Sequence, residues 1–411
     1  MKIKVCFLVA EHPFLDARIF KKEAKSLLSK GYDVTMIVPR INGYLFDIDG
    51  TFFTNQFHSQ IFIYEGIKIV TYERMYLEKH IKKLNYNLQS KKQGRFIDPL
   101  TQLGLSEEAD IYHAHEFFSL YSGVGIKRAL KTLSKKNIKL IYDSHELVPD
   151  PHEITSTLMK KHMMSLLQSM LKEVDYVITV SESIKAWYLS INPFLPVEVI
   201  YNSPPLTTNY EPKDFYETTF RIVHEGFVGK TRGNLRKIIE ITEICNQKMD
   251  VQFKIIGGAK KSDQDIVKIP SHLSNKIELV DWVNYYHIPK EMENADIGWI
   301  DLNTAHSLNN MYAMPNKLFS YLNNGLPVLV NKCTDIKNFI QTHQCGLVVN
   351  KSEASVEDYC QAILHLCNNR KELKKMSVNA RKIMEELYCW EKMEKRLFAV
   401  YDQLSNQGKV I

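Results

Sequence analysis

Two successive series of alternating strand and helix patterns, separated by a proline-containing break, most restrict the fold of this chain. The first series opens with an apolar strand over residues 3–10, a helical pattern over 17–29 and a second strand over 33–38. The break begins at Ser203, and the second series starts with a strand over residues 221–225. Strands that alternate with helices form a parallel sheet with helices on both faces. The pattern therefore predicts two Rossmann-like α/β domains.

The domain limits follow from where these patterns lie. We expect an N-terminal domain over residues 1–203, a C-terminal domain over 204–388 and a closing helical segment over 389–411, with a cleft between the two domains. A length of 411 residues fits two large domains better than one. Further strands are predicted at residues 67–71, 110–112, 138–142, 176–180, 197–201, 251–256, 297–301, 327–330 and 347–349. Ligands of parallel sheets bind beyond the carboxyl ends of the strands, so the loops that follow the strands should carry the site.

The composition limits the class of protein and its compartment. A net charge of +6 falls short of the dense basic surface of a nucleic-acid-binding protein. The seven cysteines are scattered, so they signal neither a zinc site nor a disulfide framework, and reduced thiols are expected. The N-terminus does not resemble a signal peptide, and the chain has no run of about 18 apolar residues. We expect a cytoplasmic protein that binds no nucleic acid.

The segment from Tyr312 to Gly325 predicts an anion-binding helix start in the C-terminal domain. Pro315 suits the first turn of a helix, Lys317 adds a positive charge there, and Gly325 ends the helix. The first turn of a helix offers unpaired backbone N–H groups and the positive end of the helix dipole, which together bind anions. The alternative is a packing helix that simply begins with proline.

A second candidate for anion binding is the glycine-containing segment from Gly226 through Gly229 to Gly233. It lies between the strand at 221–225 and a helix predicted from about residue 234. Glycine lets the backbone approach a ligand closely, and Arg232 can donate two parallel hydrogen bonds to phosphate oxygens. Many loops between a strand and a helix carry such residues, so the prediction depends on the two loops together.

In the first half, histidines and carboxylates follow two strands. His113-Ala-His115-Glu116 follows the strand at 110–112, and Asp143-Ser-His145-Glu146 follows the strand at 138–142. If these strands are parallel neighbours, both segments lie at one edge, where they can bind sugar hydroxyl groups or move protons. Histidines that are merely hydrogen-bonded are the alternative. We expect no metal site, on the argument that His-x-His places its two rings on opposite faces of an extended chain.

Two further features have a structural and a functional interpretation each. Asp16-Ala-Arg18 either binds an acceptor or is a helix cap with a surface arginine. Residues 79–95 carry six basic side chains and no acid, and residues 158–171 are rich in Met and Leu. Together these segments either form a peripheral membrane face or belong to solvated helices. Two Asp-x-Asp pairs, at residues 47–49 and 263–265, lie in polar surroundings and are interpreted as solvated surface.

Taken together, these motifs resemble the family-4 glycosyltransferases, a retaining group with the GT-B fold, over nearly the whole chain. The motifs that carry the resemblance are Asp16-Ala-Arg-Ile-Phe-Lys-Lys-Glu-Ala24, Asp110-Ile-Tyr-His-Ala-His115, Tyr142-Asp-Ser-His-Glu146, Asp175-Tyr-Val-Ile-Thr-Val-Ser181, Val199-Ile-Tyr-Asn202, His224-Glu-Gly226, Arg232-Gly233, Asn294-Ala-Asp-Ile-Gly298, Pro315-Asn-Lys-Leu-Phe319, Gly325-Leu-Pro-Val328 and Trp390-Glu-Lys392. The resemblance also implies that the last helix crosses back onto the first domain.

The resemblance implies an activity and a role for each matching residue. The donor is a nucleoside-diphosphate sugar bound by the C-terminal domain, the acceptor is a glycan or glycoconjugate bound by the N-terminal domain, and no metal or cofactor is required. Arg232 and Lys317 would hold the diphosphate, and His115 would contact the donor sugar. The implied donor-binding residues are Gly229, Arg232, Ala313, Met314, Pro315, Asn316, Lys317 and Ser320, and the acceptor-binding residues are Asp16, Arg18, Asp143, His145 and Glu146.

The chain departs from the family pattern at two positions. The family usually has two glutamates eight residues apart, of which the second binds the donor ribose, and Tyr312 and Ser320 stand there instead. Serine is shorter and uncharged, so the ribose contact must weaken, involve water or come from another residue. Replacing Ser320 by glutamate should tighten nucleotide binding if the ribose lies there. A catalytically weak scaffold protein and another GT-B enzyme, such as a sugar-nucleotide epimerase, are the alternatives to an active transferase.

Overall fold

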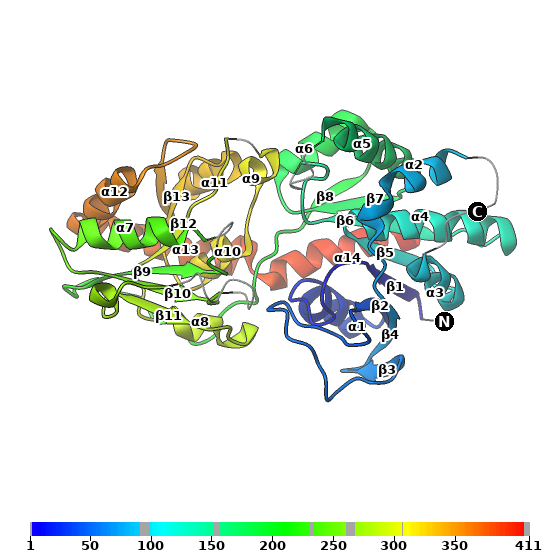
Figure 1. Ribbon diagram of the computed structural model, residues 1–411, viewed down its shortest axis with the longest axis horizontal. Helices are drawn as coiled ribbons and strands as arrows, with labels where there is room; N and C mark the ends of the chain where they lie inside the picture. The colour runs from blue at the N-terminus through cyan, green and yellow to red at the C-terminus, as the bar shows by residue number, and fades with distance from the viewer. Residues whose placement is uncertain are drawn as a thin grey trace. The chain divides into compact units, whose positions relative to one another are not determined.

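The computed structural model describes residues 2–90, 98–150, 156–229, 233–259, 268–305 and 307–406, and it divides into two compact units. Unit 1 comprises Met1–Ile200 and Glu394–Ile411, and unit 2 comprises Tyr201–Met393. Each unit is a mainly parallel sheet with helices packed on it, which confirms the α/β class that the alternating pattern predicts (Figure 1).

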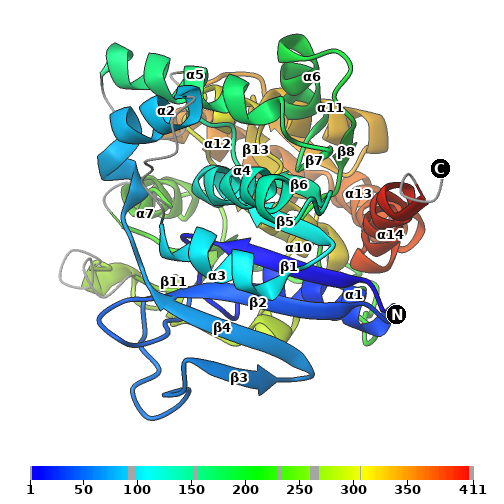
Figure 2. The ribbon, with the colours of Figure 1, turned by 90° about the vertical axis from the view of Figure 1, so that its right-hand side faces the viewer.

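The sheet of unit 1 has eight strands in the order β3-β4-β2-β1-β5-β6-β7-β8, part of which is seen side by side in Figure 2. They are β1 (Lys4–Val9), β2 (Asp33–Arg40), β3 (Ile61–Tyr64), β4 (Ile67–Glu73), β5 (Ile111–His115), β6 (Lys139–Ser144), β7 (Tyr176–Thr179) and β8 (Val197–Val199). The helices are η1 (Ile19–Ala24), α1 (Lys25–Ser29), η2 (Leu77–His80), α2 (Ile81–Gln89), α3 (Pro99–Glu107), α4 (Glu116–Leu133), α5 (Thr157–Leu171) and α6 (Glu182–Ile191).

The sheet of unit 2 has six parallel strands in the order β11-β10-β9-β12-β13-β14. They are β9 (Phe220–Glu225), β10 (Val251–Ile256), β11 (Ile277–Val280), β12 (Ile297–Ile300), β13 (Val328–Asn331) and β14 (Gly346–Val349). The helical segments are α7 (Leu235–Cys245), η4 (Ser271–Leu273), η5 (Tyr285–His287), α8 (Ile288–Glu291), α9 (Leu308–Tyr312), α10 (Asn316–Asn323), α11 (Thr334–His343), α12 (Val356–Asn368), α13 (Arg370–Ile383) and η6 (Met384–Tyr388).

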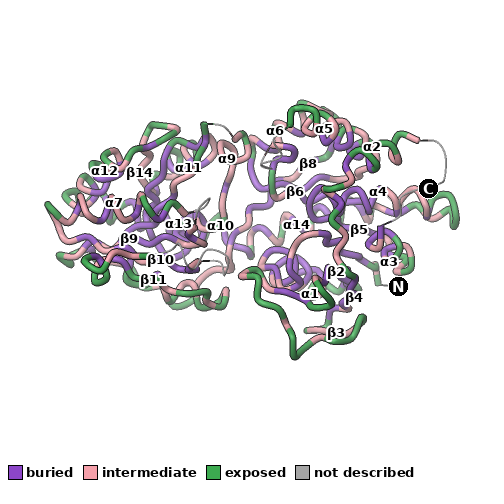
Figure 3. The backbone as a smooth tube through the Cα atoms, in the orientation of Figure 1, coloured by how far each residue is buried: buried purple, intermediate pink, exposed green. Residues whose placement is uncertain are grey.

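The central strands are almost entirely buried, as Figure 3 shows for both sheets. Every residue of β5, β12 and β13 is buried, because helices cover the sheet and leave no face to solvent. Two strands are absent from the sequence prediction, namely β3 and β11. Both lie at a sheet edge, and most of their residues are exposed or half-buried, so they lack a continuous buried pattern. β3 is also antiparallel to β4.

The last helix, α14 (Trp390–Asn406), packs mostly within unit 1. Glu394 accepts a hydrogen bond from the Ser26 hydroxyl at 3.0 Å, and Arg396 donates to the carbonyl oxygen of Val199 at 3.1 Å. Farther along the helix, the hydroxyl of Tyr401 lies 2.9 Å from Nδ1 of His113 on β5. The C-terminal end of the chain therefore supplies core contacts to the sheet that the N-terminal residues begin.

Candidate functional site

A cluster of polar side chains lies at the carboxyl ends of neighbouring strands in unit 1. β5 pairs in parallel with β1 and with β6, and the register places His115 opposite Val9 on one side and Asp143 on the other. The predicted adjacency of the two histidine-containing segments is therefore confirmed. Two residues past Asp143, the Nε2 atom of His145 lies 3.1 Å from Asp143 Oδ2.

A buried ion-pair network supports this cluster. Arg18 donates from Nε and Nη2 to the two carboxylate oxygens of Asp143, at 3.0 and 2.9 Å. It also donates from Nη1 to the carbonyl oxygen of Ile200 at 2.8 Å. Its Nε lies 2.9 Å from Oε1 of Glu23, a residue of η1 that the sequence interpretation did not single out. The arginine thus ties the first helical segment to β6 and to the end of β8.

The structure corrects the interpretation of Arg18 as an acceptor-binding or surface residue. Its side chain is 1% exposed, and each of its guanidinium nitrogens already has a partner. Asp143, also expected to touch the acceptor, is fully buried. Both residues position their neighbours instead. Asp16 Oδ1 accepts the backbone N–H groups of Arg18 and Ile19 at 2.8 and 3.0 Å, which confirms the helix-capping alternative for Asp16.

The argument against a metal from the His-x-His spacing is wrong. Side chains two residues apart on a strand share one face, and the rings of His113 and His115 stack with centroids 4.4 Å apart. Ligand atoms of Glu23, His113, His115 and Asp143 lie within 4.8 Å of one another. Arg18 already contacts the carboxyl groups of both Glu23 and Asp143, so a cation would have to share these groups with the guanidinium. A reaction without metal stays a prediction.

More accessible groups border the buried network. His145 Nδ1 lies 3.6 Å from Glu116 Oε1, His12 Nε2 lies 3.9 Å from the same oxygen, and His12 Nδ1 lies 3.4 Å from Asp16 Oδ2. Glu116 begins α4 with φ of 69°, a left-handed conformation that is strained for a non-glycine residue and recurs at functional sites. Glu146 is exposed. Glu116 belongs to the candidate segment that the sequence places directly after a strand, whereas His12 was not predicted as a site residue.

Burial and the ion pairs shift the pKa values of these groups in different directions. Burial lowers the pKa of His115 to about 4, although Asp143 opposes this shift. Burial would raise the pKa of Asp143, but Arg18 and His145 hold it well below its usual value. Burial and the nearby Asp143 raise the pKa of Glu23. At neutral pH the network therefore holds a neutral His115, an ionised Asp143 and a Glu23 that favours its protonated form.

These shifts predict an acid-dependent loss of stability that involves His115. Its pKa is about 4 in the folded state against 6.5 for an unperturbed histidine, so the unfolded state binds the extra proton and stability falls as pH decreases through that window. We expect the unfolding free energy of the wild type to fall by about 3 kcal/mol more than that of His115→Asn between these pH values. The raised pKa of Glu23 makes the protein more stable as pH decreases, which opposes the effect of His115. Because both proteins contain Glu23, its contribution cancels in the difference between them. The unfolding free energy is measured by urea denaturation at a series of pH values. The same pH dependence in both proteins would contradict the assignment.

In unit 2, α10 begins where the sequence predicts an anion-binding helix start. Pro315 is the N-cap residue and has no side-chain capping bond, so the first-turn N–H groups of the helix are not satisfied by a cap side chain. Asn316 is exposed, while Ala313, Pro315 and Lys317 are half-buried. Met314 is buried, so its side chain is not available to a ligand at the surface. Whether these residues bind the donor stays a prediction.

The carboxyl end of β9 lies beside this helix start. A Cβ atom built on Gly226 would stand 3.2 Å from Nζ of Lys317, which shows that the ammonium group lies close to this glycine, and its φ of 117° disfavours other residues there. Lys317 also lowers the pKa of Glu225, although burial of that carboxyl group has the larger, opposite effect. Gly229 is half-buried. Arg232, the other predicted phosphate ligand, lies outside the described residues.

Tyr321 holds α10 against the ends of two strands. Its ring occupies the space next to Gly298 on β12, where a Cβ atom would lie 2.1 Å from Tyr321 Cδ2. Its hydroxyl accepts the N–H of Glu225 at 2.7 Å and donates to the carbonyl oxygen of Trp299 at 3.3 Å. Ser320, the residue before Tyr321 on the helix, hydrogen-bonds the carboxyl group of Glu225. Glu225 and Tyr321 are site residues that the sequence interpretation missed.

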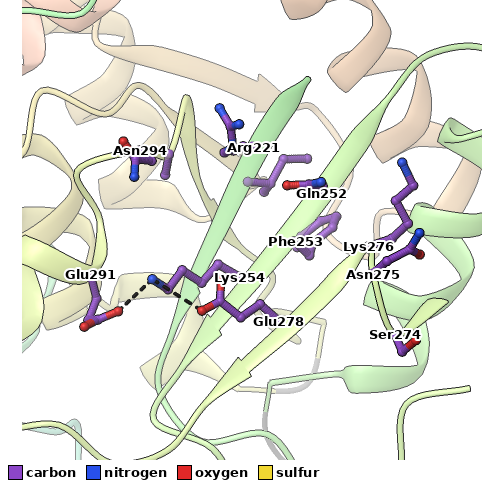
Figure 4. A pocket seen from close by; sticks show the side chains of 12 residues that line it. Arg221, Gln252, Phe253, Lys254, Ser274, Asn275, Lys276, Glu278, Glu291 and Asn294 are labelled. Carbon is purple, nitrogen blue, oxygen red and sulfur yellow. Dashed lines mark hydrogen bonds and ion pairs between the residues drawn. The ribbon is translucent and has the colours of Figure 1, made fainter. Parts of the chain in front are cut away.

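A separate pocket of unit 2 lies elsewhere on the sheet (Figure 4). Arg221 and Gln252, which line it, stand near the amino ends of β9 and β10. Lys254 crosses the pocket wall and pairs with Glu291 at 2.6 Å and Glu278 at 3.7 Å. Ligands of parallel sheets bind at the opposite, carboxyl edge, so we assign no function to this pocket.

The proposed membrane face is only partly described. Lys79, Lys82 and Lys83 are exposed, whereas residues 91–97 lie outside the described residues. The Met and Leu side chains expected beside them mostly belong to the core, since Met163, Leu166, Leu167, Met170 and Leu171 of α5 are buried. Within the described residues, none of the helices is long and apolar enough to cross a membrane.

Two protein families match the sequence, one in each half. Residues 17–203 match Glycosyltransferase Family 4, and residues 226–369 match Glycosyl transferases group 1. No curated protein matches the chain in sequence. The first matched segment contains Arg18, His115, Glu116, Asp143 and His145 of the polar cluster, and the second begins directly after β9 and contains Gly226 and α10.

Solved structures share the fold over almost the whole chain at low sequence identity. Sucrose-phosphate synthase from Thermosynechococcus elongatus has a TM-score of 0.70 and 13% identity, covering 99% of this chain and 100% of that one. HepE from Anabaena, solved with UDP, has a TM-score of 0.65 and 14% identity over 98% and 100%. The lipopolysaccharide outer core galactosyltransferase WaaB has a TM-score of 0.58 and 14% identity over 97% and 99%.

Proposed function

The chain belongs to the family-4 glycosyltransferases of the GT-B fold, and we propose that it transfers a sugar from a nucleoside-diphosphate sugar to a glycan, lipid-linked or other glycoconjugate acceptor. The observation that carries the choice of donor is the place of Lys317, whose ammonium group lies over Gly226 at the start of α10. A cation at a helix start that has no capping side chain suits a diphosphate. HepE has been solved with UDP and with UDP-glucose, which supports testing uridine donors first.

The acceptor is proposed to bind the polar groups that border the buried ion-pair network of unit 1. His12, Glu116 and His145 offer hydrogen-bond donors and acceptors to sugar hydroxyl groups, with Asp16 and Glu146 beside them. Arg18 and Asp143 are buried beneath these groups and hold them in position. Direct contact between His115 and the donor sugar stays a prediction. Its side chain is as fully buried as that of Asp143, and its polar neighbours are Asp143 Oδ2 at 3.4 Å and His145 Nε2 at 3.5 Å.

We propose that the sugar keeps its anomeric configuration and that no metal or cofactor takes part. The acceptor hydroxyl attacks the anomeric carbon on the face from which the diphosphate departs. The new carbon–oxygen bond forms, the bond to the diphosphate oxygen breaks, and the hydroxyl proton passes to the leaving phosphate. In such a reaction the protein positions both substrates and stabilises the charge on the leaving group. Lys317 would supply that stabilisation.

A catalytically weak scaffold protein is the second candidate, because Ser320 stands where the family usually has a glutamate. A donor screen separates the two. The purified protein is incubated with UDP-, GDP- and ADP-sugars, and nucleotide release is measured with and without glycan and glycolipid acceptors. Acceptor-dependent release with a retained anomeric configuration is the expected result. Tight binding of a donor without any turnover would instead favour the scaffold, and absence of donor binding would refute the proposed function.

A further inference from the structure

Glu225 has an incomplete set of hydrogen bonds at the carboxyl end of β9. Its backbone N–H donates to Tyr321 at 2.7 Å, and its carboxyl group takes a hydrogen bond from Ser320. Its Oε2 atom is shielded from solvent and has no hydrogen-bond partner within the described residues. Buried carboxylate oxygens are rarely left without a donor, since the missing bond is costly. A bound ligand can supply that donor after the carboxyl group turns about its terminal bond, a rotation with a broad minimum.

The neighbouring charges indicate which part of a donor meets this carboxyl group. Lys317 stands three residues before Ser320 on α10 and lies over Gly226, the residue after Glu225. Phosphate oxygens are attracted to that ammonium group and repelled by the carboxylate. Within a nucleoside diphosphate, the ribose offers two adjacent hydroxyl donors without negative charge. Carboxylates bind ribose hydroxyl groups in other α/β nucleotide-binding folds.

We propose that Glu225 binds the ribose hydroxyl groups of the sugar-nucleotide donor, an inference that rests on the proposed function. A carboxylate on strand β9 then does what a longer acidic side chain at position 320 on α10 would otherwise do. The short Ser320 side chain leaves room for it and donates to it. Glu225 on β9 thus replaces the acidic side chain that is missing at position 320 on α10.

This arrangement reverses the result expected for Ser320→Glu. The sequence alone predicts that glutamate at position 320 tightens nucleotide binding. Next to Glu225, however, a second carboxylate replaces a hydrogen-bond donor with a like charge, so the single variant should bind nucleotide more weakly. The double variant Glu225→Gln with Ser320→Glu again has one carboxylate in the region and should recover much of the affinity.

The test measures binding of UDP, GDP and ADP by calorimetry and continues with the tightest of the three. The 2′-deoxy and 3′-deoxy forms of that nucleotide should bind the wild type about 10- to 100-fold more weakly, and Glu225→Gln should weaken the ribonucleotide by a similar factor. Glu225→Gln should no longer distinguish the deoxy forms from the ribonucleotide, because the same contact is already lost. Glu240→Gln on α7 is the matched control and should retain wild-type affinity.

Each other outcome overturns the inference in a recognisable way. If Glu225→Gln still distinguishes ribose from deoxyribose, the ribose contact lies on another residue, while the proposed function stands. If the variant weakens only the complete sugar nucleotide and not the nucleoside diphosphate, Glu225 contacts the transferred sugar. If none of the three nucleotides binds the wild type, both the proposed function and this inference fail.

Discussion

Replacing Arg18 by methionine should lower the free energy of unfolding by about 3–5 kcal/mol, the largest stability effect we expect from a single substitution in unit 1. The guanidinium group makes two bonds to Asp143 and one to the carbonyl oxygen of Ile200, and its side chain is 1% exposed. Methionine fills much of the volume but leaves the Asp143 carboxylate buried without its cation. The cost comes from that uncompensated charge rather than from lost packing.

Denaturation in urea, followed by fluorescence and by hydrogen exchange in unit 1, measures the effect. Lys68→Met is the matched control, because Lys68 also pairs with a carboxylate, Glu107 at 2.8 Å, but is 42% exposed. That variant should change stability by less than about 1 kcal/mol. Arg18→Lys should recover only part of the loss, since its donors share one nitrogen and lack the planar fork with which Arg18 reaches both Asp143 oxygens and the Ile200 carbonyl group. Equal effects of Arg18→Met and Lys68→Met would show that the buried network does not stabilise the fold.

The sequence predicted the strand-end location of this cluster but not its internal arrangement. The strand patterns before His113 and Asp143 were enough to locate the cluster, because neighbouring parallel strands have their carboxyl ends at the same edge of the sheet. Glu23 and Tyr401 could not be identified in the same way. Glu23 stands inside a helical segment, where a charged residue is normally solvated. Tyr401 and His113 are 288 residues apart in the sequence, and no local sequence pattern predicts a contact over that separation.

On the donor side, helix periodicity and Pro315 located α10 to within a residue at each end. The pattern did not reveal that Glu225 faces Ser320, because the side-chain direction at the last residue of a strand depends on the helix packed against it. Tyr321 and Gly298 fix that packing through a contact between distant positions. The departure at Ser320 was visible in the sequence, but its partner became evident only in three dimensions.

Lys317→Met should reduce kcat/KM for the sugar-nucleotide donor by about 10²- to 10³-fold, the largest effect on activity that we expect. The ammonium group lies at the start of α10 and next to Gly226, where the diphosphate is proposed to bind. Its charge should matter more in the transition state than in the ground state, because negative charge grows on the leaving phosphate as the bond to the sugar breaks. We therefore expect kcat to fall more than the affinity for the intact donor.

Initial rates of nucleotide release at varied donor concentration separate these two quantities, and Lys371→Met, an exposed lysine on α13, is the control that should behave as wild type. Lys317→Arg should retain more activity than Lys317→Met, since it keeps the charge. Methionine also removes the cation beside Glu225, so the pKa of that carboxyl group should rise further and the ribonucleotide affinity of Lys317→Met should decline as pH is lowered. Unchanged kcat and unchanged donor affinity in Lys317→Met would place the diphosphate elsewhere. A lower affinity with unchanged kcat would mean that Lys317 binds donor and transition state equally and does not stabilise the leaving group.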